Sequence, residues 1–270
     1  MSVSQIDNFG SLFENENYVL LKNYLYNYLL RKKAVERNIT IGNQGFILEV
    51  GSGLSPMVTN TNTVVYSELS LEALRILKRG HSRGSYVAAN GMQLPFKTGV
   101  FAQTICSEVL EHLADDRKAL KELARVMKPS GQLIITFPHR KFYFAYDDHY
   151  VKHLRRYELP EMEDRLKAVG LSPVAIQKIL GPLEKVTMWF VVSCFSLLEK
   201  YKPDKYKATG LSKLMRIIAP FFRWANLIYA GLAWLDAKIM PRSLATVLLI
   251  RAEKYKKYNN YKIMSRKNDN

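Results

Sequence analysis

The chain has 270 residues, of which 48% are hydrophobic, and it carries 40 basic against 24 acidic side chains, a net charge of +16. This apolar content excludes a disordered chain. The two cysteines, Cys106 and Cys194, lie far apart and form no CxxC pair, which disfavours a disulfide framework or a zinc site. The first ten residues lack a basic start followed by an apolar run, so we expect no targeting peptide and a cytoplasmic protein.

The apolar pattern predicts one helix followed by alternating strands and helices. Residues 11–37 repeat leucine and tyrosine at helical spacing. Strands are predicted at 46–50, 63–67, 86–89, 101–106, 132–137 and 244–250, and a further strand begins at 173. Helices are predicted at 71–79, 114–127 and 159–169. Pro129-Ser130-Gly131 is expected to end the helix at 114–127. This alternation is typical of an α/β fold with a doubly wound, mostly parallel, seven-stranded sheet.

The region before the last strand is unusual. Val186–Leu198 holds thirteen residues without a charge and Trp224–Leu235 holds twelve, both shorter than the roughly 20 that a membrane span needs. Just before the second stretch, Lys213, Arg216 and Arg223 interrupt apolar residues at helical spacing. The pattern is typical of a basic amphipathic helix at a membrane interface, and it also fits a helical lid packed on the sheet.

Most of the net positive charge lies in the last quarter of the chain. Residues 201–270 hold 15 basic and 4 acidic side chains. This asymmetry favours a polyanionic partner, such as anionic lipid, nucleic acid or a phosphorylated substrate; the alternative is a solvated basic face. Together the patterns predict an N-terminal helical cap at 1–40, a core at 41–180, a helical insert at 181–241, the last strand at 242–252 and a basic tail at 253–270.

A glycine-rich loop, Glu49-Val50-Gly51-Ser52-Gly53, follows the first predicted strand. Its glycines allow a sharp turn close to a ligand, and Glu49 can attract the positive end of an amino-acid ligand. Glu68 ends the next strand, where a carboxylate can accept hydrogen bonds from two ribose hydroxyls. Ser55 and Pro56 would crowd a pyrophosphate, which disfavours NAD as the ligand. Residues 55–63 form a short stretch rich in Thr and Asn, so we expect them to form a loop. Taken alone, the glycine motif also fits an ordinary strand-to-helix turn.

A third block carries more specific motifs: Leu94-Pro95-Phe96, Glu108-Val109-Leu110-Glu111-His112 and Arg125-Val126-Met127-Lys128-Pro129-Ser130-Gly131. With them the chain, from Phe46 to Pro138, resembles the class I S-adenosylmethionine-dependent methyltransferases, which have a Rossmann-like sheet. The resemblance implies S-adenosylmethionine as cofactor. It places Glu49, Gly51, Ser52 and Gly53 at the methionine end, Glu68 at the ribose, Leu69, Asn90, Gly91 and Met92 at the adenine, and Ser107 near the sulfonium. Asn90 replaces the family's usual Asp.

Acceptor-side residues are expected after the fifth strand, in the segment His139–Tyr157. It contains three of the chain's five histidines and follows the carboxyl end of a strand, where open α/β sheets bind ligands. Histidine titrates near neutrality and can serve as a base, so His149, His153 and Tyr150 are the catalytic candidates. Arg155 and Arg156 could clamp an anionic acceptor. The alternative is a polar surface loop.

Glu108, Glu111 and His112 form E-x-x-E-H, which is similar to the metal-binding motif of ubiquinone-pathway O-methyltransferases. We expect no metal and prefer a pocket-lining or structural role for these residues.

The sequence therefore predicts a methyltransferase that uses S-adenosylmethionine to methylate oxygen or nitrogen of a small-molecule or lipid-linked acceptor, with peripheral contact to the anionic inner face of a membrane. One alternative is an RNA methyltransferase, favoured by interleaved lysines and tyrosines in residues 251–270 but lacking an Asn-Pro-Pro-Tyr motif. Another is a non-catalytic binding protein, favoured by Asn90 and by Ala102 where the family has Asp. The acceptor and the oligomeric state stay open.

Overall fold

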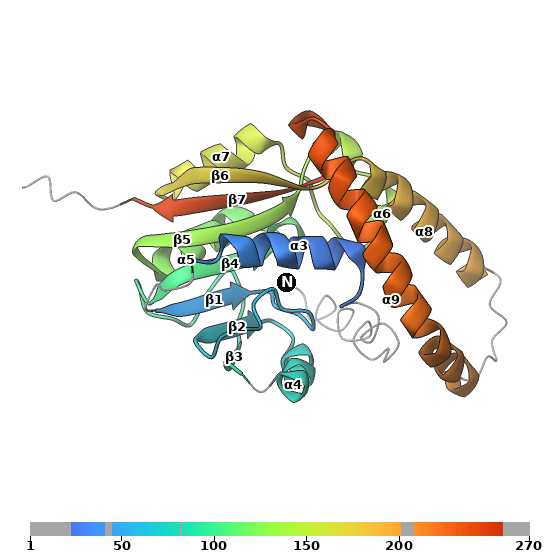
Figure 1. The fold of residues 1–270 in the computed structure, drawn as a ribbon. Helices are drawn as coiled ribbons and strands as arrows, with labels where there is room; N and C mark the ends of the chain where they lie inside the picture. The colour runs from blue at the N-terminus through green and yellow to red at the C-terminus, as the bar shows by residue number, and fades with distance from the viewer. Residues whose placement is uncertain (1–22, 41–44, 82, 201–207, 256–270) are drawn as a thin grey trace, which may run out of the picture.

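Seven strands form one sheet in the computed structural model, which describes residues 23–40, 45–81, 83–200 and 208–255. In chain order the strands are β1 (Phe46–Val50), β2 (Val64–Glu68), β3 (Ser85–Ala88), β4 (Phe101–Ser107), β5 (Met127–Pro138), β6 (Leu171–Leu180) and β7 (Val247–Lys254). They lie in the order β3-β2-β1-β4-β5-β7-β6 (Figure 1). The pairs among β1 to β5 are parallel, while β7 runs antiparallel to both neighbours. This confirms the predicted mostly parallel, doubly wound sheet.

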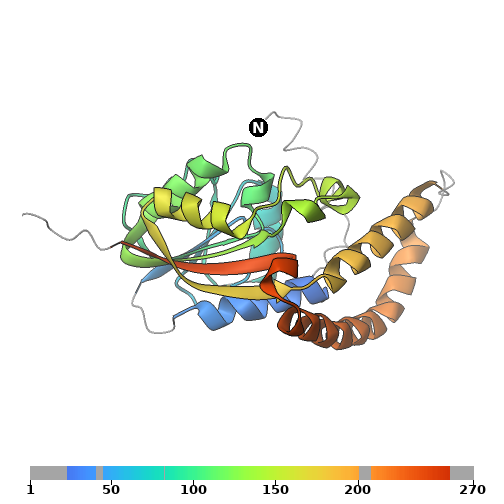
Figure 2. The same ribbon diagram turned by 90° about the horizontal axis from the view of Figure 1, so that it is seen from above.

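Helices cover both faces of the sheet (Figure 2). One face packs against α3 (Tyr26–Asn38), α4 (Leu71–Gly80) and α9 (Ala208–Ile239), and the other against α5 (Asp116–Val126) and α7 (Leu159–Ala168). Caps fix two of these helices at their starts: the side chain of Ser70 accepts from Ala73 N–H before α4, and that of Asp115 accepts from Lys118 N–H before α5. Shorter helical turns are η1 (Leu110–His112), η2 (Lys141–Tyr143), α6 (Tyr146–Tyr150) and η3 (Arg242–Leu244).

Some predicted elements have other bounds in the structure, and some extend into residues that the structure does not describe. Helix α5 ends at Val126, close to its predicted end, but strand β5 begins at Met127 and not at 132 as predicted, because Met127 pairs with Phe101 across an irregularity in β4. Residues 23–25 form a turn, so the helix predicted over 11–37 is wrong there and α3 begins at Tyr26; residues 11–22 of the prediction lie outside the described residues. So does most of the basic tail, residues 256–270, and with it most of the sequence argument for RNA. Residues 55–63 form a loop, as predicted.

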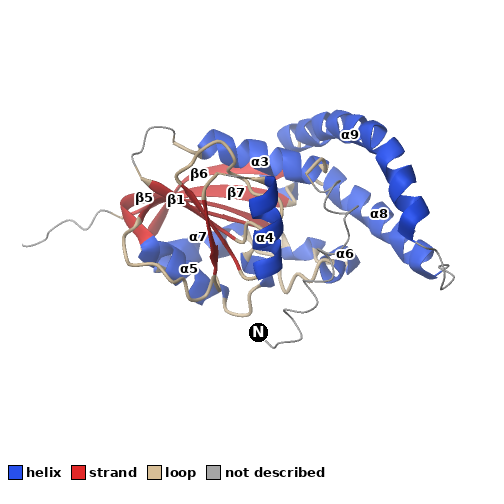
Figure 3. Cartoon of the chain, turned by 90° about the horizontal axis from the view of Figure 1, so that it is seen from below, coloured by secondary structure: helices blue, strands red, loops and turns tan. Residues whose placement is uncertain are grey.

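The predicted insert consists of two helices, α8 (Leu183–Lys200) and α9. They extend together away from the sheet, and the C-terminal part of α9 returns to pack on α3 and β6 (Figure 3). Within the described ranges, no helix combines the length and the apolar character that a membrane span requires.

Candidate cofactor and acceptor site

The loop after β1 needs glycine at two positions. Gly51 and Gly53 have φ angles of 71° and 53°, in the left-handed region that other residues adopt at a cost. A Cβ on Gly51 would lie 2.4 Å from Cγ2 of Val109, so the side chain is excluded by space as well as by conformation. Val109 thus packs directly against the backbone of Gly51.

Glu68 ties the end of β2 to this loop. Its Oε2 accepts from Gly53 N–H at 3.0 Å, and its Oε1 accepts from the N–H groups of Leu69 and Ser70 at 2.8 and 3.1 Å. The carboxylate thus sits between the glycine loop and the start of α4, at the carboxyl ends of β1 and β2. This is the position in which the sequence placed a ribose-binding carboxylate.

Glu49, predicted at the methionine end of the cofactor, has contacts that the sequence did not predict. Its carboxylate is buried and accepts from the N–H groups of Met57 and Val58 at 2.7 and 3.1 Å. Burial raises its pKa to about 7, although both hydrogen bonds oppose that shift. The geometry makes Glu49 a support for the 51–58 loop, because both oxygens are directed at the loop backbone.

The turn after β3 supplies the next predicted residues. Asn90 Oδ1 accepts from Met92 N–H at 2.9 Å, so the side chain that would recognise an adenine amino group also shapes its own turn. A carbonyl oxygen has a second lone pair, which keeps a further bond available. Gly91 lies beside β1, since a Cβ there would be 3.3 Å from Cγ1 of Val50.

The end of β4 is held by an ion pair that the sequence analysis missed. Ser107 Oγ lies 2.8 Å from Thr136 Oγ1, which donates to Glu108 at 3.2 Å. The other carboxylate oxygen of Glu108 lies 3.2 Å from Arg31 on α3. Glu108 also has a φ of 54°, a left-handed conformation that is unfavourable for residues other than glycine and often occurs at functional sites. No spacing rule links residues 31 and 108, because only the packing of α3 on the sheet brings them together.

Asp148 is the centre of the acceptor-side segment. Its buried Oδ1 binds Nδ1 of His153 and Nε of Arg156, each at 2.8 Å, and its Oδ2 lies 3.0 Å from Nζ of Lys185 on α8. Burial alone would raise the pKa of Asp148, but the hydrogen bond from His153 and the two cations hold it well below its ordinary value. Asp148 therefore stays ionised and orients three side chains.

The three catalytic candidates have different surroundings. His153 is largely covered, with its side chain 12% exposed, and is oriented by Asp148. His149 and Tyr150 are exposed, and the His149 ring packs against Phe144. The predicted clamp is wrong: Arg156 is buried on Asp148, and Arg155 pairs with Asp116 at 3.0 Å. Among the candidates, the geometry favours His153.

One described cluster could hold a metal ion: Glu111, His112 and His153 offer ligand atoms that all lie within 4.8 Å of one another. Glu108, the first residue of the E-x-x-E-H motif, is turned instead to Arg31. Glu111 is fully buried, and neither of its oxygens accepts a hydrogen bond from a described residue. Burial and the charge of Glu108 raise the pKa of Glu111 well above its usual range. Absence of a metal stays a prediction.

The outer side of α9 carries a continuous apolar stripe. Large side chains recur every three or four residues and are 45–75% exposed: Phe221, Trp224, Ile228, Leu232, Leu235 and Ile239. The inner side, which packs on the domain, has the small buried residues Ala230, Ala233 and Ala237. We refer to the six outer residues as the α9 stripe. It is about 27 Å long at the rise of an α-helix.

Comparisons with known proteins agree with this architecture. A family model described as a methyltransferase domain matches residues 48–135. A demethylmenaquinone methyltransferase of Streptomyces griseus is 36% identical over 93 residues, which cover 33% of this chain and 40% of that protein. A second such protein, from Streptomyces avermitilis, is 29% identical over 50% of this chain and 71% of its own length. The match thus spans about two fifths of the first of these relatives.

Solved structures share the fold over most of the chain. An S-adenosylmethionine-dependent methyltransferase of Thermotoga maritima aligns with a TM-score of 0.57 and 15% identity, covering 90% of this chain and 95% of its own. Geranyl diphosphate C-methyltransferase of Streptomyces coelicolor aligns with a TM-score of 0.54 and 11% identity, covering 83% of this chain and 76% of its own.

Proposed function

We propose that this chain, which belongs to the class I S-adenosylmethionine-dependent methyltransferase family, transfers a methyl group from S-adenosylmethionine to oxygen or nitrogen of a small or lipid-linked acceptor at a membrane surface. The observation that carries the proposal is the pairing of the bare Gly51–Gly53 backbone with the Glu68 carboxylate at the carboxyl ends of β1 and β2.

The residues present fit the cofactor. Gly51 has no Cβ, which lets the loop backbone lie close to Val109, and the buried hydroxyls of Ser52 and Ser55 have no hydrogen-bond partner among the described residues. Buried polar atoms without hydrogen-bond partners are uncommon, and these two hydroxyls lie in the loop that contains Gly51 and Gly53. Glu68 would hold the ribose hydroxyls, Asn90 the adenine and the Gly51–Gly53 backbone the methionine end. When bound, S-adenosylmethionine supplies an electrophilic methyl group on a sulfonium.

His153 would take the proton that an acceptor hydroxyl or amine must lose. Its Nδ1 is held by Asp148 Oδ1 at 2.8 Å, which fixes the tautomer and leaves Nε2 as the basic nitrogen. The negative charge of Asp148 also stabilises the imidazolium that forms. Asp148 is kept ionised for this purpose by Arg156 and Lys185. Asp148 acts through His153 and is a positioning residue.

The α9 stripe supports action at a membrane surface. A row of exposed apolar side chains about 27 Å long, with tryptophan at position 224, suits an amphipathic helix lying in a bilayer interface. A chain with a net charge of +16 is attracted to an anionic leaflet. Demethylmenaquinone methyltransferases, which the chain resembles in part, are named for a lipid-soluble quinone. A lipid-linked acceptor would reach the protein from the same surface.

The cofactor and the proton acceptor can be tested separately. Calorimetry with S-adenosylmethionine measures binding, and transfer of labelled methyl into lipid and water-soluble extracts measures turnover. His153→Gln keeps a donor for Asp148 but has no basic nitrogen, so we expect turnover to fall at least about a hundredfold with cofactor affinity unchanged. His81→Ala, at the end of α4, is the control. Absence of cofactor binding would refute the function; full activity of His153→Gln would refute the base.

Vesicle flotation tests the membrane contact. Ile228→Ser with Leu232→Ser interrupts the α9 stripe and is expected to reduce flotation with anionic vesicles, because apolar insertion contributes to binding together with charge. Exposed Ser replacements on α4, Leu71→Ser with Glu72→Ser, serve as the control. Equal flotation of wild type and the stripe variant would contradict the membrane contact while leaving methyl transfer untouched.

A further inference from the structure

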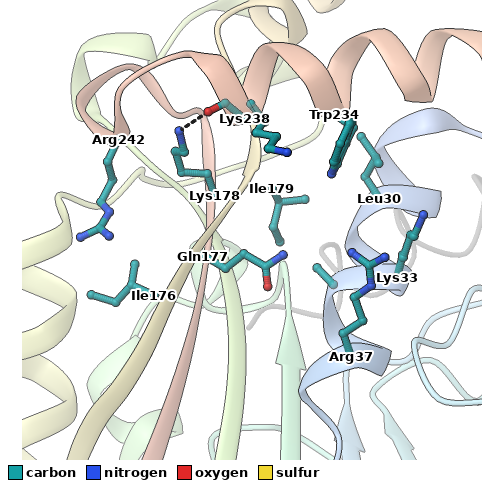
Figure 4. A pocket seen from close by; sticks show the side chains of 12 residues that line it. Leu30, Lys33, Arg37, Ile176, Gln177, Lys178, Ile179, Trp234, Lys238 and Arg242 are labelled. Atoms are coloured by element: carbon teal, nitrogen blue, oxygen red, sulfur yellow. Dashed lines mark hydrogen bonds between the residues drawn. The ribbon is translucent and has the colours of Figure 1, made fainter.

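A groove of about 380 Å³ lies where α3, β6, α9 and η3 meet (Figure 4). Five of the side chains that line it are cations: Lys33 and Arg37 from α3, Lys178 from β6, Lys238 from α9 and Arg242 from η3. No aspartate or glutamate is among its lining residues. The groove is separate from the cofactor loops, which lie at the carboxyl ends of β1 and β2.

The fold brings these like charges together without a described counter-charge in the groove. Lys178 donates from Nζ to the carbonyl oxygens of Lys238 and Met240, so it is fixed at the C-terminal end of α9. Glu36, the acid on α3 between Lys33 and Arg37, lies 3.1 Å from Lys32. Converging cations repel one another, and an anion between them would relieve that repulsion. The expected ligand therefore carries a concentrated negative charge, such as a phosphate.

The remaining wall gives the groove an apolar side. Trp234 lines it, is about half exposed and lies with its ring 5.1 Å from Nζ of Lys238. Leu235 and Ile239 of the α9 stripe are on the same helical turns as these two residues. A ligand with a phosphate in the groove could thus extend an apolar chain along α9. Tryptophan beside lysine is typical of the boundary between lipid headgroups and acyl chains.

We propose that this groove binds the phosphate headgroup of an anionic membrane lipid. The proposal rests on the membrane contact proposed above and adds a specific site to it. The α9 stripe would enter the apolar layer, while the headgroup held by α3, β6 and η3 would fix the rotation of the domain on the bilayer. Free phosphate compounds share the headgroup chemistry, but only a lipid uses both the cationic groove and the adjoining apolar stripe.

Charge reversal at matched positions tests the site. Lys33→Glu with Arg37→Glu changes the groove, and Lys78→Glu with Arg79→Glu makes the same change in net charge in the last turn of α4. Flotation is measured with phosphatidylcholine vesicles, with and without phosphatidylglycerol. We expect the groove variant to bind the anionic vesicles about tenfold or more weakly than wild type. The α4 variant should change by less than about twofold, and circular dichroism checks that both fold.

Equal losses in the two variants, or no loss in either, would overturn the groove. Calorimetry with glycerophosphate tests whether a soluble phosphate compound is the ligand instead. If glycerophosphate binds the wild type but not the Lys33→Glu, Arg37→Glu variant, and anionic vesicles do not bind, a membrane lipid is refuted as the ligand. Cofactor binding is measured in the same variants by calorimetry and should be unchanged. If vesicle binding depends on the groove but no methyl transfer is detected, the result counts against the proposed function alone. If methyl transfer is detected but vesicle binding does not depend on the groove, the result counts against the groove alone.

Discussion

The sheet domain and the helical insert place their large apolar side chains in opposite ways. On α5, Leu120 and Leu123 face the sheet and are almost completely buried. On α9, residues of the same chemistry face outward, and alanines occupy the face against the domain. Burying a leucine stabilises a protein by roughly 1.5–3 kcal/mol, and the α9 stripe does not obtain this from the described chain. The difference indicates that the apolar side chains of α5 stabilise the fold, whereas those on the outer side of α9 serve a contact outside the domain.

The largest effect is expected where the insert is joined to the sheet domain. Asp148→Asn removes the charge shared by Lys185 on α8 and Arg156. It should lower the free energy of unfolding by about 3–5 kcal/mol, because the buried Arg156 loses its carboxylate, whereas Lys185 keeps Asp147 at 2.6 Å. Asp164→Asn, at an exposed ion pair with Lys167, should change it by less than about 1 kcal/mol. Urea unfolding compares them. A loss below about 1 kcal/mol for Asp148→Asn would show that the network does not anchor the insert.

A matched pair of leucines tests the comparison directly. Leu123→Ala should cost about 2–5 kcal/mol, because it leaves a cavity under α5. Leu232→Ala should cost less than about 0.5 kcal/mol, because Leu232 is exposed on α9. Both values come from thermal or urea unfolding of the chain without lipid. A large loss for Leu232→Ala would mean that protein covers the α9 stripe in solution, which favours a lid or a second copy of the chain over a membrane.

The sheet domain should also show a pH dependence set by Glu49. A carboxyl whose pKa rises from 4.5 to about 7 on folding binds a proton more tightly in the folded state. Its contribution to stability is therefore present below pH 4.5 and is lost as pH rises through 7, by about 3 kcal/mol for a shift of this size. Glu49→Gln should flatten this part of the stability curve. An unchanged slope between pH 5 and 7 would contradict the buried, proton-binding state of Glu49.

The glycine loop offers a pair that separates crowding from backbone conformation. Gly51 and Gly99 both have positive φ, 71° and 74°, but a Cβ would strike Val109 at Gly51 and meet nothing within 4 Å at Gly99. Gly51→Ala should weaken S-adenosylmethionine binding about a hundredfold, roughly 2.7 kcal/mol, while Gly99→Ala should only lower stability by about 1–2 kcal/mol. Calorimetry measures the first effect and unfolding the second. Equal affinities would remove the loop from the cofactor site.

The smallest effect is expected from metal removal. Treatment with a chelator should leave methyl transfer unchanged, because the carboxylate of Asp148 orients the proposed proton acceptor, His153, without a metal ion. The assay compares treated protein with and without added Zn²⁺. Loss of activity that Zn²⁺ restores would contradict this and would make His153 a metal ligand instead of the proton acceptor.

Several elements could be predicted from the sequence because their signals are local. Strand β1 has its predicted bounds, Phe46–Val50, since a continuous apolar run ends at Gly51. The glycines of the loop have the positive φ angles that a sharp turn requires. Strand β5 was predicted too short because Met127 joins the sheet through Phe101, a contact that no local pattern encodes. The hydrogen bonds of Glu49 could not be predicted for the same reason: its partners, Met57 and Val58, depend on the path of a loop.

Periodicity and residue type were sufficient to predict the type of sheet, the glycine loop with Glu68, and an apolar, basic insert. They could not predict which of the histidines has an orienting carboxylate, which side of α9 faces outward, or that five cations line one groove: Lys33, Arg37, Lys178, Lys238 and Arg242. These features depend on contacts between distant parts of the chain. Such contacts join residues far apart in sequence, and they exist only once the sheet has packed its helices.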